Sequence, residues 1–175
     1  MKKYRTADLT TAAMMVAIIA IFAQITIPVG LVPVTLQTAG VILAVTILDH
    51  RRTFFALTAY VGLGLVGLPV FSMGKAGLGV IIGPTGGFLF GFIIGGFLGA
   101  WYLSRHKRPR LLQAYVASSI ALAVNLIVGG FYFALIMARP LLESFAITVF
   151  PFLLIEAGKI AAFTPLGFAV RKALP

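Results

Sequence analysis

Long apolar runs follow one another along almost the whole chain, and short segments rich in lysine and arginine separate them. Of the 175 residues, 61% are hydrophobic and 10% are charged, whereas an ordinary soluble domain carries about 25% charged residues. This composition predicts a membrane protein. Because a helix of roughly 20 residues crosses a bilayer, the length accommodates about six such helices. We expect them to form one domain over residues 1–175.

The predicted fold class is an all-α bundle of transmembrane helices. Backbone groups in lipid must hydrogen-bond internally, and the apolar runs lack the strict alternation of barrel strands. The expected spans are Leu9–Ile27, Val34–Leu48, Phe54–Phe71, Phe88–Leu103, Leu111–Met137 and Phe145–Val170.

The basic residues follow these spans in an alternating pattern. If the six spans alternate in direction, only Lys75 and Arg139 fall on one side of the membrane. Eleven fall on the other: Lys2, Lys3, Arg5, Arg51, Arg52, Arg105, Lys107, Arg108, Arg110, Arg171 and Lys172. The positive-inside rule then places both termini in the cytoplasm. The net charge of +10 thus indicates topology and contact with anionic lipid head groups, and we expect no nucleic-acid partner.

Three loops then face outside, at residues 28–35, Pro69–Gly87 and 138–144. The middle loop, between the third and fourth spans, is the longest and is both apolar and glycine-rich. Such backbone is tolerated at membrane depth only where it is buried in protein or lines a cavity. We therefore expect a lid or a re-entrant wall over a pocket.

Two patterns of small residues predict close helix contacts. Glycines recur every fourth residue from Gly91 through Gly95 to Gly99, and Ala13 and Ala17 have the same spacing in the first span. Small residues at this spacing let helix backbones approach closely in lipid. For the alanines, packing within the bundle and docking of a separate membrane subunit both remain open.

Glu156 and Lys159 are the only charged residues well inside an apolar run. Three positions apart on a helix, they share a face and can bond each other. Charges at membrane depth cost several kcal/mol, so such a pair is by default a site hypothesis. A structural ion pair is the alternative, but packed apolar residues would avoid its desolvation cost. We favour the floor of a polar cavity.

Few other residues could complete such a site. Candidate ligand contacts are the polar side chains of Gln37, Thr85, Asn125 and Lys75, the GPTGG residue Gly86, and the aromatic Phe71, Phe88 and Tyr132. Cysteine is absent, and both histidines lie in cytoplasmic loops. Neither a catalytic constellation nor a phosphate-binding loop ending in GK[ST] occurs, so we expect no enzyme, metal site or cofactor.

Three segments together resemble the BioY family, the biotin-specific substrate-binding (S) components of energy-coupling factor (ECF) transporters. They are VPVTLQTAGVILA at 32–44, GLPVFSMGKAGLGVIIGPTGGFLFGF at 67–92 and PFLLIEAGK at 151–159. The resemblance implies high-affinity biotin capture from outside, in the plasma membrane of a bacterium or archaeon. It also implies delivery inward with a transmembrane coupling protein and two ATPases on other chains. Ala13 and Ala17 match the surface that docks the coupling protein.

Biotin has two urea N–H donors, a urea carbonyl and a carboxylate on a flexible chain. Glu156 could accept from the urea N–H groups while Lys159 donates to the carbonyl. Because that pair is neutral, the carboxylate needs another cation, for which Lys75 is the first candidate and Arg139 the second.

Other interpretations remain. The chain could be an S component for thiamine or riboflavin, a membrane-embedded enzyme acting on a lipid or isoprenoid, or a structural subunit. A homo-oligomer is also open.

Overall fold

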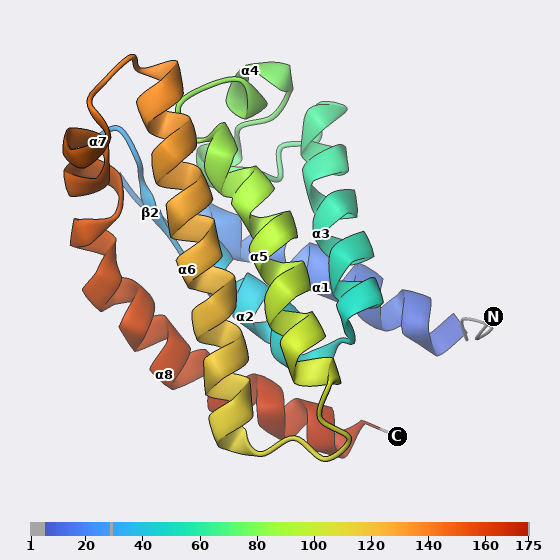
Figure 1. Ribbon diagram of the computed structural model, residues 1–175. Helices are drawn as coiled ribbons and strands as arrows, with labels where there is room; N and C mark the ends of the chain where they lie inside the picture. Colours follow the sequence, from blue (N-terminus) through green and yellow to red (C-terminus); the bar gives the residue numbers. More distant parts are fainter. Residues whose placement is uncertain (1–5, 29, 175) are drawn as a thin grey trace.

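The computed structural model describes residues 6–28 and 30–174, so Lys2, Lys3 and Arg5 lie outside the described residues. It is mostly helical (Figure 1). The helices are α1 (Thr6–Gln24), α2 (Gln37–Ile47), α3 (His50–Leu65), α4 (Leu78–Ile81), α5 (Gly86–Ser104), α6 (Leu111–Ile136), α7 (Leu141–Thr148) and α8 (Phe150–Ala173), with a 3-10 turn η1 (Ser72–Gly74). Two short strands, β1 (Thr26–Ile27) and β2 (Val34–Thr35), pair antiparallel.

The bundle has two recognisable ends (Figure 1). Helix α4 and the turn between α6 and α7 lie at one end, which we call the α4 end. The connection between α5 and α6 and the end of α8 lie at the other. Helix α5 packs along α6, α3 packs on α5, α8 packs on α2, and α1 packs on α2 and α3.

Three helices are long and apolar enough to cross a bilayer, judged by length and composition within the described residues: α5, α6 and α8. Leu9–Gln24 and α2 are shorter apolar helices. The chain therefore has the character of a multi-pass membrane protein. The number of six spans and the cytoplasmic location of both termini stay predictions.

Several predicted boundaries were wrong. The last span was expected over Phe145–Val170, but two helices, α7 and α8, meet at Val149. Pro151 explains the break, because it has no backbone N–H for a helical bond to the residue four positions earlier and its ring would clash there, whereas the first turn of a helix tolerates it. The all-α expectation also missed the β1–β2 ribbon. Helix α3 ends at Leu65 rather than Phe71, and the following turn has Gly67 at a φ of 104°.

The glycine spacing in α5 serves helix packing. Methyl groups added at Gly95 and Gly99 would overlap the main-chain oxygens of Ala121 and Ala117 in α6. A methyl group at Gly91 would overlap Asn125. Helices α5 and α6 thus touch backbone to backbone, as small residues at this spacing permit.

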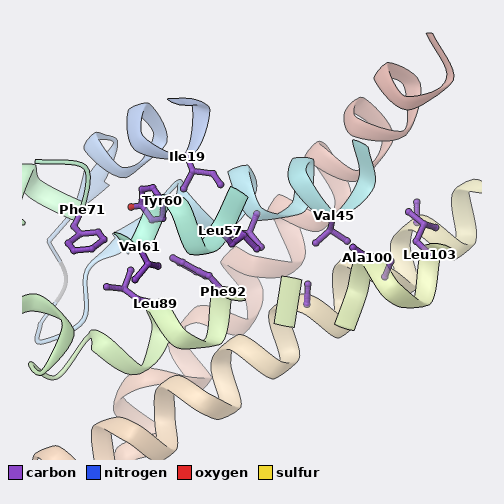
Figure 2. Close-up of a cluster of buried hydrophobic side chains, with 14 of the residues drawn as sticks. Ile19, Val45, Leu57, Tyr60, Val61, Phe71, Leu89, Phe92, Ala100 and Leu103 are labelled. Carbon is purple, nitrogen blue, oxygen red and sulfur yellow. The ribbon is translucent and has the colours of Figure 1, made fainter. Parts of the chain in front are cut away.

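A cluster of buried apolar side chains joins α1, α2, α3 and α5 (Figure 2). Ile19, Leu57, Tyr60 and Phe71 are among its largest fully buried members. Because lipid is as apolar as these side chains, dispersion in a well-filled interior holds this cluster together rather than exclusion from water.

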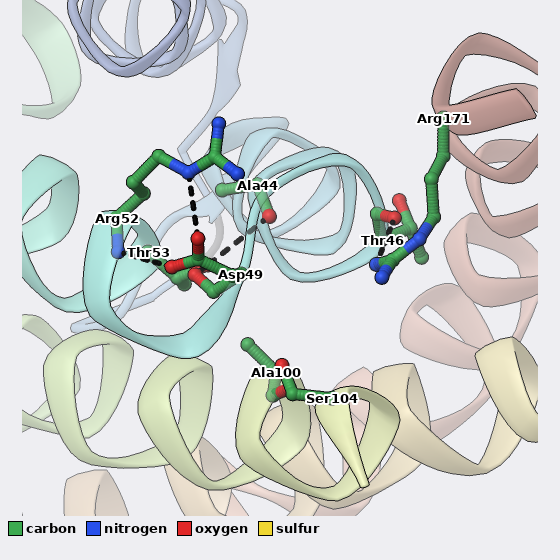
Figure 3. Close-up of polar contacts among 8 residues, drawn as sticks. All are labelled: Ala44, Thr46, Asp49, Arg52, Thr53, Ala100, Ser104 and Arg171. Atoms are coloured by element: carbon green, nitrogen blue, oxygen red, sulfur yellow. Dashed lines mark hydrogen bonds and ion pairs between the residues drawn. The ribbon is translucent and has the colours of Figure 1, made fainter. Parts of the chain in front are cut away.

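Polar contacts fasten the junction between α2 and α3 (Figure 3). Asp49 caps α3 by accepting from the Arg52 backbone N at 2.9 Å and from Arg52 Nε at 2.8 Å. Burial alone would raise the pKa of Asp49, but the hydrogen bonds and charge of Arg52 bring it below its ordinary value. Arg171, near the end of α8, donates to the main-chain oxygen of Thr46 at 3.1 Å. The ends of α2 and α8 are thereby tied together.

We predict that Gly95→Ala lowers the thermal unfolding midpoint of the detergent-solubilised protein, by an amount equivalent to about 1–3 kcal/mol of overpacking. The control is Gly62→Ala in α3, where an added methyl group meets no atom within 4 Å. It should leave the midpoint unchanged or raise it, because alanine is the better helix former. Equal effects of the two substitutions would contradict the close α5–α6 contact.

Candidate ligand-binding site

A cavity of about 170 Å³ opens near the α4 end. Its lining comes from the β1–β2 ribbon and its turn, the start of α2, the connection between α3 and α5, and helices α5, α6, α7 and α8. Seven of the predicted ligand contacts line it: Gln37, Phe71, Lys75, Thr85, Phe88, Asn125 and Glu156. Segments far apart in the sequence thus meet around one space large enough for a small molecule rather than a single water.

Glu156 and Lys159 form a buried ion pair on α8, with 6% and 8% of each residue exposed. Lys159 Nζ donates to Glu156 Oε1 at 2.7 Å, to Thr38 Oγ1 at 2.8 Å and to the main-chain oxygen of Thr35 at 2.7 Å. An ammonium group has three donors. All three are therefore occupied by protein acceptors.

Two residues of the cavity lining each have a buried acceptor atom with no hydrogen-bond partner among the described residues. The atoms are Oε2 of Glu156 and Oδ1 of Asn125, whose residue is 2% exposed. Leaving a buried polar atom unpaired is costly, and such atoms call for an explanation. Because both residues line one cavity, their unpaired atoms are candidate acceptors for a ligand.

The side-chain amide of Gln37 is hydrogen-bonded through both its oxygen and its nitrogen. Its Oε1 accepts from Thr35 Oγ1 at 2.9 Å, and its Nε2 donates to the Tyr60 hydroxyl at 2.5 Å. Gln37 is 5% exposed, so its orientation is set by these neighbours rather than by water.

The connection between α3 and α5, residues 66–85, supplies part of the wall. Phe71 is buried against Gly64, where a methyl group would overlap its ring. Gln24 Nε2 of α1 donates to the main-chain oxygen of Phe71 at 3.3 Å. Lys75 follows η1, lines the cavity and is itself exposed. The wall thus carries one cation at the mouth.

Three predicted contacts are placed outside the described lining. Gly86 closes the turn before α5, where a methyl group would overlap the main-chain oxygen of Ile81. The Tyr132 hydroxyl donates to that same oxygen at 3.0 Å and so ties α6 to α4. Lys159 borders instead a shallow apolar cleft between the ribbon and α8. Arg139 pairs with Glu143, away from the cavity lining.

Sequence reasoning missed several lining residues. Thr38 bonds both members of the ion pair, donating to Glu156 Oε1 at 3.1 Å. It directly follows Gln37, which would have been the signal. Phe92, Thr148 and Phe152 also line the cavity, but nothing distinguishes them in sequence from core residues. Within residues 6–28 and 30–174, no group of three His, Cys, Asp or Glu side chains is placed to hold a metal.

The predicted docking pair lies on the outer surface. Ala13 and Ala17 are both exposed on α1, along with Met14 and Ile21. The alanines therefore do not serve internal packing between the described helices.

The fold is that of an S component. A crystal structure of the S-component for biotin from an ECF-type ABC transporter superimposes with a TM-score of 0.90, covering 98% of this chain and 94% of that chain at 24% identity. A family model described as BioY family matches residues 1–175. The chain belongs to the BioY family.

Relatives of this chain come from bacteria and archaea. The biotin transporter BioY2 of Lactococcus lactis is 36% identical over 95% of this chain and 91% of that protein. The probable biotin transporter BioY of Pyrococcus horikoshii is 32% identical over 88% and 90%. The biotin transporter BioY of Thermotoga maritima is 43% identical over 55% and 63%. These relatives are named as transporters, and the family is not one of enzymes.

We predict that Lys159→Met destabilises the ligand-free protein by about 3–5 kcal/mol, because it leaves the Glu156 carboxylate buried without its cation. The double variant Glu156→Gln with Lys159→Met removes both charges and should recover much of the loss. Thermal unfolding midpoints in detergent measure both. A double variant less stable than Lys159→Met would show that the pair is not the source of the cost.

Proposed function

We propose that this chain binds biotin from the extracellular side and is the substrate-capture subunit of an ECF-type ABC transporter. One observation carries the proposal: Glu156 and Asn125, which line the cavity of a BioY-family chain, each have a buried acceptor atom without a described partner. Biotin's fused head has two urea N–H donors, which match two acceptors. Residues 1–175 would act as a single substrate-binding domain.

The geometry changes the part proposed for Lys159. All three of its donors are used within the protein, so we assign it to hold the Glu156 carboxylate in place. Glu156 and Asn125 would then accept from the urea, while the Gln37 amide or the Thr85 hydroxyl donates to the urea carbonyl. Phe71 and Phe88 would contact the apolar parts of the ligand. Gly86 and Tyr132 would shape the turn beside the cavity.

Lys75 is proposed to hold the carboxylate. The ion pair at the cavity floor is neutral, and Arg139 is engaged by Glu143. Among the lining residues, Lys75 supplies the uncompensated positive charge. Biotin would therefore lie with its head towards α8 and its carboxylate towards η1.

In the proposed topology, six helices span the membrane with both termini in the cytoplasm. The described basic residues support it: Arg105, Lys107, Arg108 and Arg110 occupy the connection between α5 and α6, at the end opposite α4. The α4 end, with the cavity, would then face outside. The plasma membrane of a bacterium or archaeon is the proposed location.

Isothermal titration of the purified protein against biotin, thiamine and riboflavin tests the ligand. We expect a heat of binding with biotin and none with thiamine or riboflavin. The absence of a heat of binding with biotin would overturn the proposal. Lys75→Ala should weaken biotin roughly two- to fivefold, the range for an exposed ion pair, and leave biotin amide almost unchanged. Lys107→Ala, an exposed cation far from the cavity lining, is the control. Equal weakening of biotin and biotin amide would exclude Lys75 as the carboxylate partner.

We further propose that the transmembrane coupling protein docks on the exposed face of α1 at Ala13 and Ala17. It would bring two ATPases with it, since no described segment of this chain supplies a nucleotide site. Small residues on an exposed helix face allow another helix to approach closely in lipid.

Ala17→Trp should abolish this approach without touching the cavity. We expect biotin binding to stay within about twofold of the wild type, because surface substitutions away from a site change free energies by about 0.5 kcal/mol. Energised uptake in cells and copurification with the coupling protein should be lost. Ala157→Trp, at an alanine that is also exposed but on α8, is the matched control and should retain uptake. Unchanged uptake in Ala17→Trp would place the docking surface elsewhere.

A further inference from the structure

Tyr60 lies outside the cavity lining but connects two parts of it. It belongs to α3 and is fully buried. Its hydroxyl accepts from Gln37 Nε2 at 2.5 Å and donates to the main-chain oxygen of Val70 at 2.8 Å. Gln37 lines the cavity, and Val70 directly precedes the lining residue Phe71. One hydroxyl thus joins the start of α2 to the segment that covers the cavity.

The direction of these hydrogen bonds fixes the Gln37 amide. A carbonyl oxygen only accepts, so the Tyr60 proton goes to Val70, and the hydroxyl oxygen must accept from Gln37. The NH₂ group of Gln37 therefore faces Tyr60. Its oxygen faces Thr35, whose hydroxyl donates to it and in turn accepts from the Gln37 backbone N at 3.3 Å. In the chain of hydrogen bonds from Thr35 through Gln37 and Tyr60 to Val70, the donor and the acceptor of every bond are therefore fixed.

Ring packing reinforces the same link. The Tyr60 and Phe71 rings meet edge to face, with centroids 5.7 Å apart and an angle of 80° (Figure 2). Gly64, one helical turn after Tyr60, leaves the space that the Phe71 ring fills. Gly64 and Tyr60 on α3 thus contact the Phe71 ring, and Tyr60 also hydrogen-bonds the Gln37 amide of the cavity lining.

We propose that Tyr60 is a positioning residue for ligand binding. It fixes the orientation of the Gln37 amide, which lines the cavity, and couples that orientation to the position of residues 70–71. A flat ligand head with fixed N–H and C=O directions, such as a cyclic urea, would be the class most sensitive to this orientation. The inference rests on the proposed function, because it requires that the cavity bind such a ligand.

Tyr60→Phe keeps the ring and removes the hydroxyl. We expect the dissociation constant for biotin to rise on the order of tenfold, the change expected when about 1.4 kcal/mol is lost. Tyr132→Phe removes a tyrosine bond to the same connection, at Ile81, without reaching Gln37, and should weaken binding less. Tyr115→Phe removes a hydroxyl that donates to Ala161 at 3.4 Å on the exposed side and is the control.

A double-mutant cycle separates positioning from a merely structural role. If Tyr60 acts through Gln37, Tyr60→Phe should have little further effect on affinity in a Gln37→Ala background. Additive losses, or an affinity of Tyr60→Phe equal to that of Tyr115→Phe, would overturn the inference. Wild-type protein that fails to bind biotin would overturn the proposed function instead, so the two failures are distinguishable.

Hydrogen exchange tests the coupling without any change at Tyr60, should Tyr60→Phe fail to fold. Biotin should slow amide exchange over residues 69–77 in the wild type. Gln37→Met, measured at saturating biotin, should lose this slowing at Val70, because the bonded path from the ligand through Gln37 and Tyr60 is gone. Lys75, which is proposed to contact the ligand directly, should keep its slowing. Full protection of Val70 in Gln37→Met would overturn the coupling.

Discussion

The ammonium group of Lys159 is the contact on which the site depends. In a protein interior at membrane depth, each of its three protons needs an acceptor. The acceptors come from three places: Glu156 on the same helix, Thr38 in α2, and the backbone of Thr35 in β2. Satisfying one charge therefore fixes the position of α8 against the start of α2 and against the ribbon.

This arrangement explains why Glu156, a residue of the cavity lining, has an acceptor atom without a hydrogen-bond partner. Lys159 and Thr38 both bond Oε1 of Glu156, which leaves Oε2 without a described partner. The carboxylate is thus held through one of its two oxygens. Asn125 adds a second unpaired acceptor from α6, which glycine in α5 brings close. The proposed ligand is one whose donors match these two acceptors.

Much of this was accessible from sequence, for physical reasons that can be named. A charge pair in an apolar run is rare enough to mark a site, and glycine every fourth residue marks a close helix contact. The length of α3 and the break at Val149 were not found, because apolarity continues through Phe71 and across residues 145–150 without a change in period. Pro151 was the available signal for the break. Tyr60 was missed because nothing in a sequence distinguishes a tyrosine whose hydroxyl bridges two segments from one in an ordinary core.

The contact between α5 and α6 limits how a captured molecule could travel. At Gly95 and Gly99 the two helices meet main chain to main chain, so a passage between them would require the helices to separate along their length. The ties at both ends of the α2–α8 pair, through Lys159 and Arg171, oppose sliding of those helices as well. A bundle joined in this way has few internal hinges. The cavity and the helices that surround it would then move together as one unit, with little change in the cavity's shape.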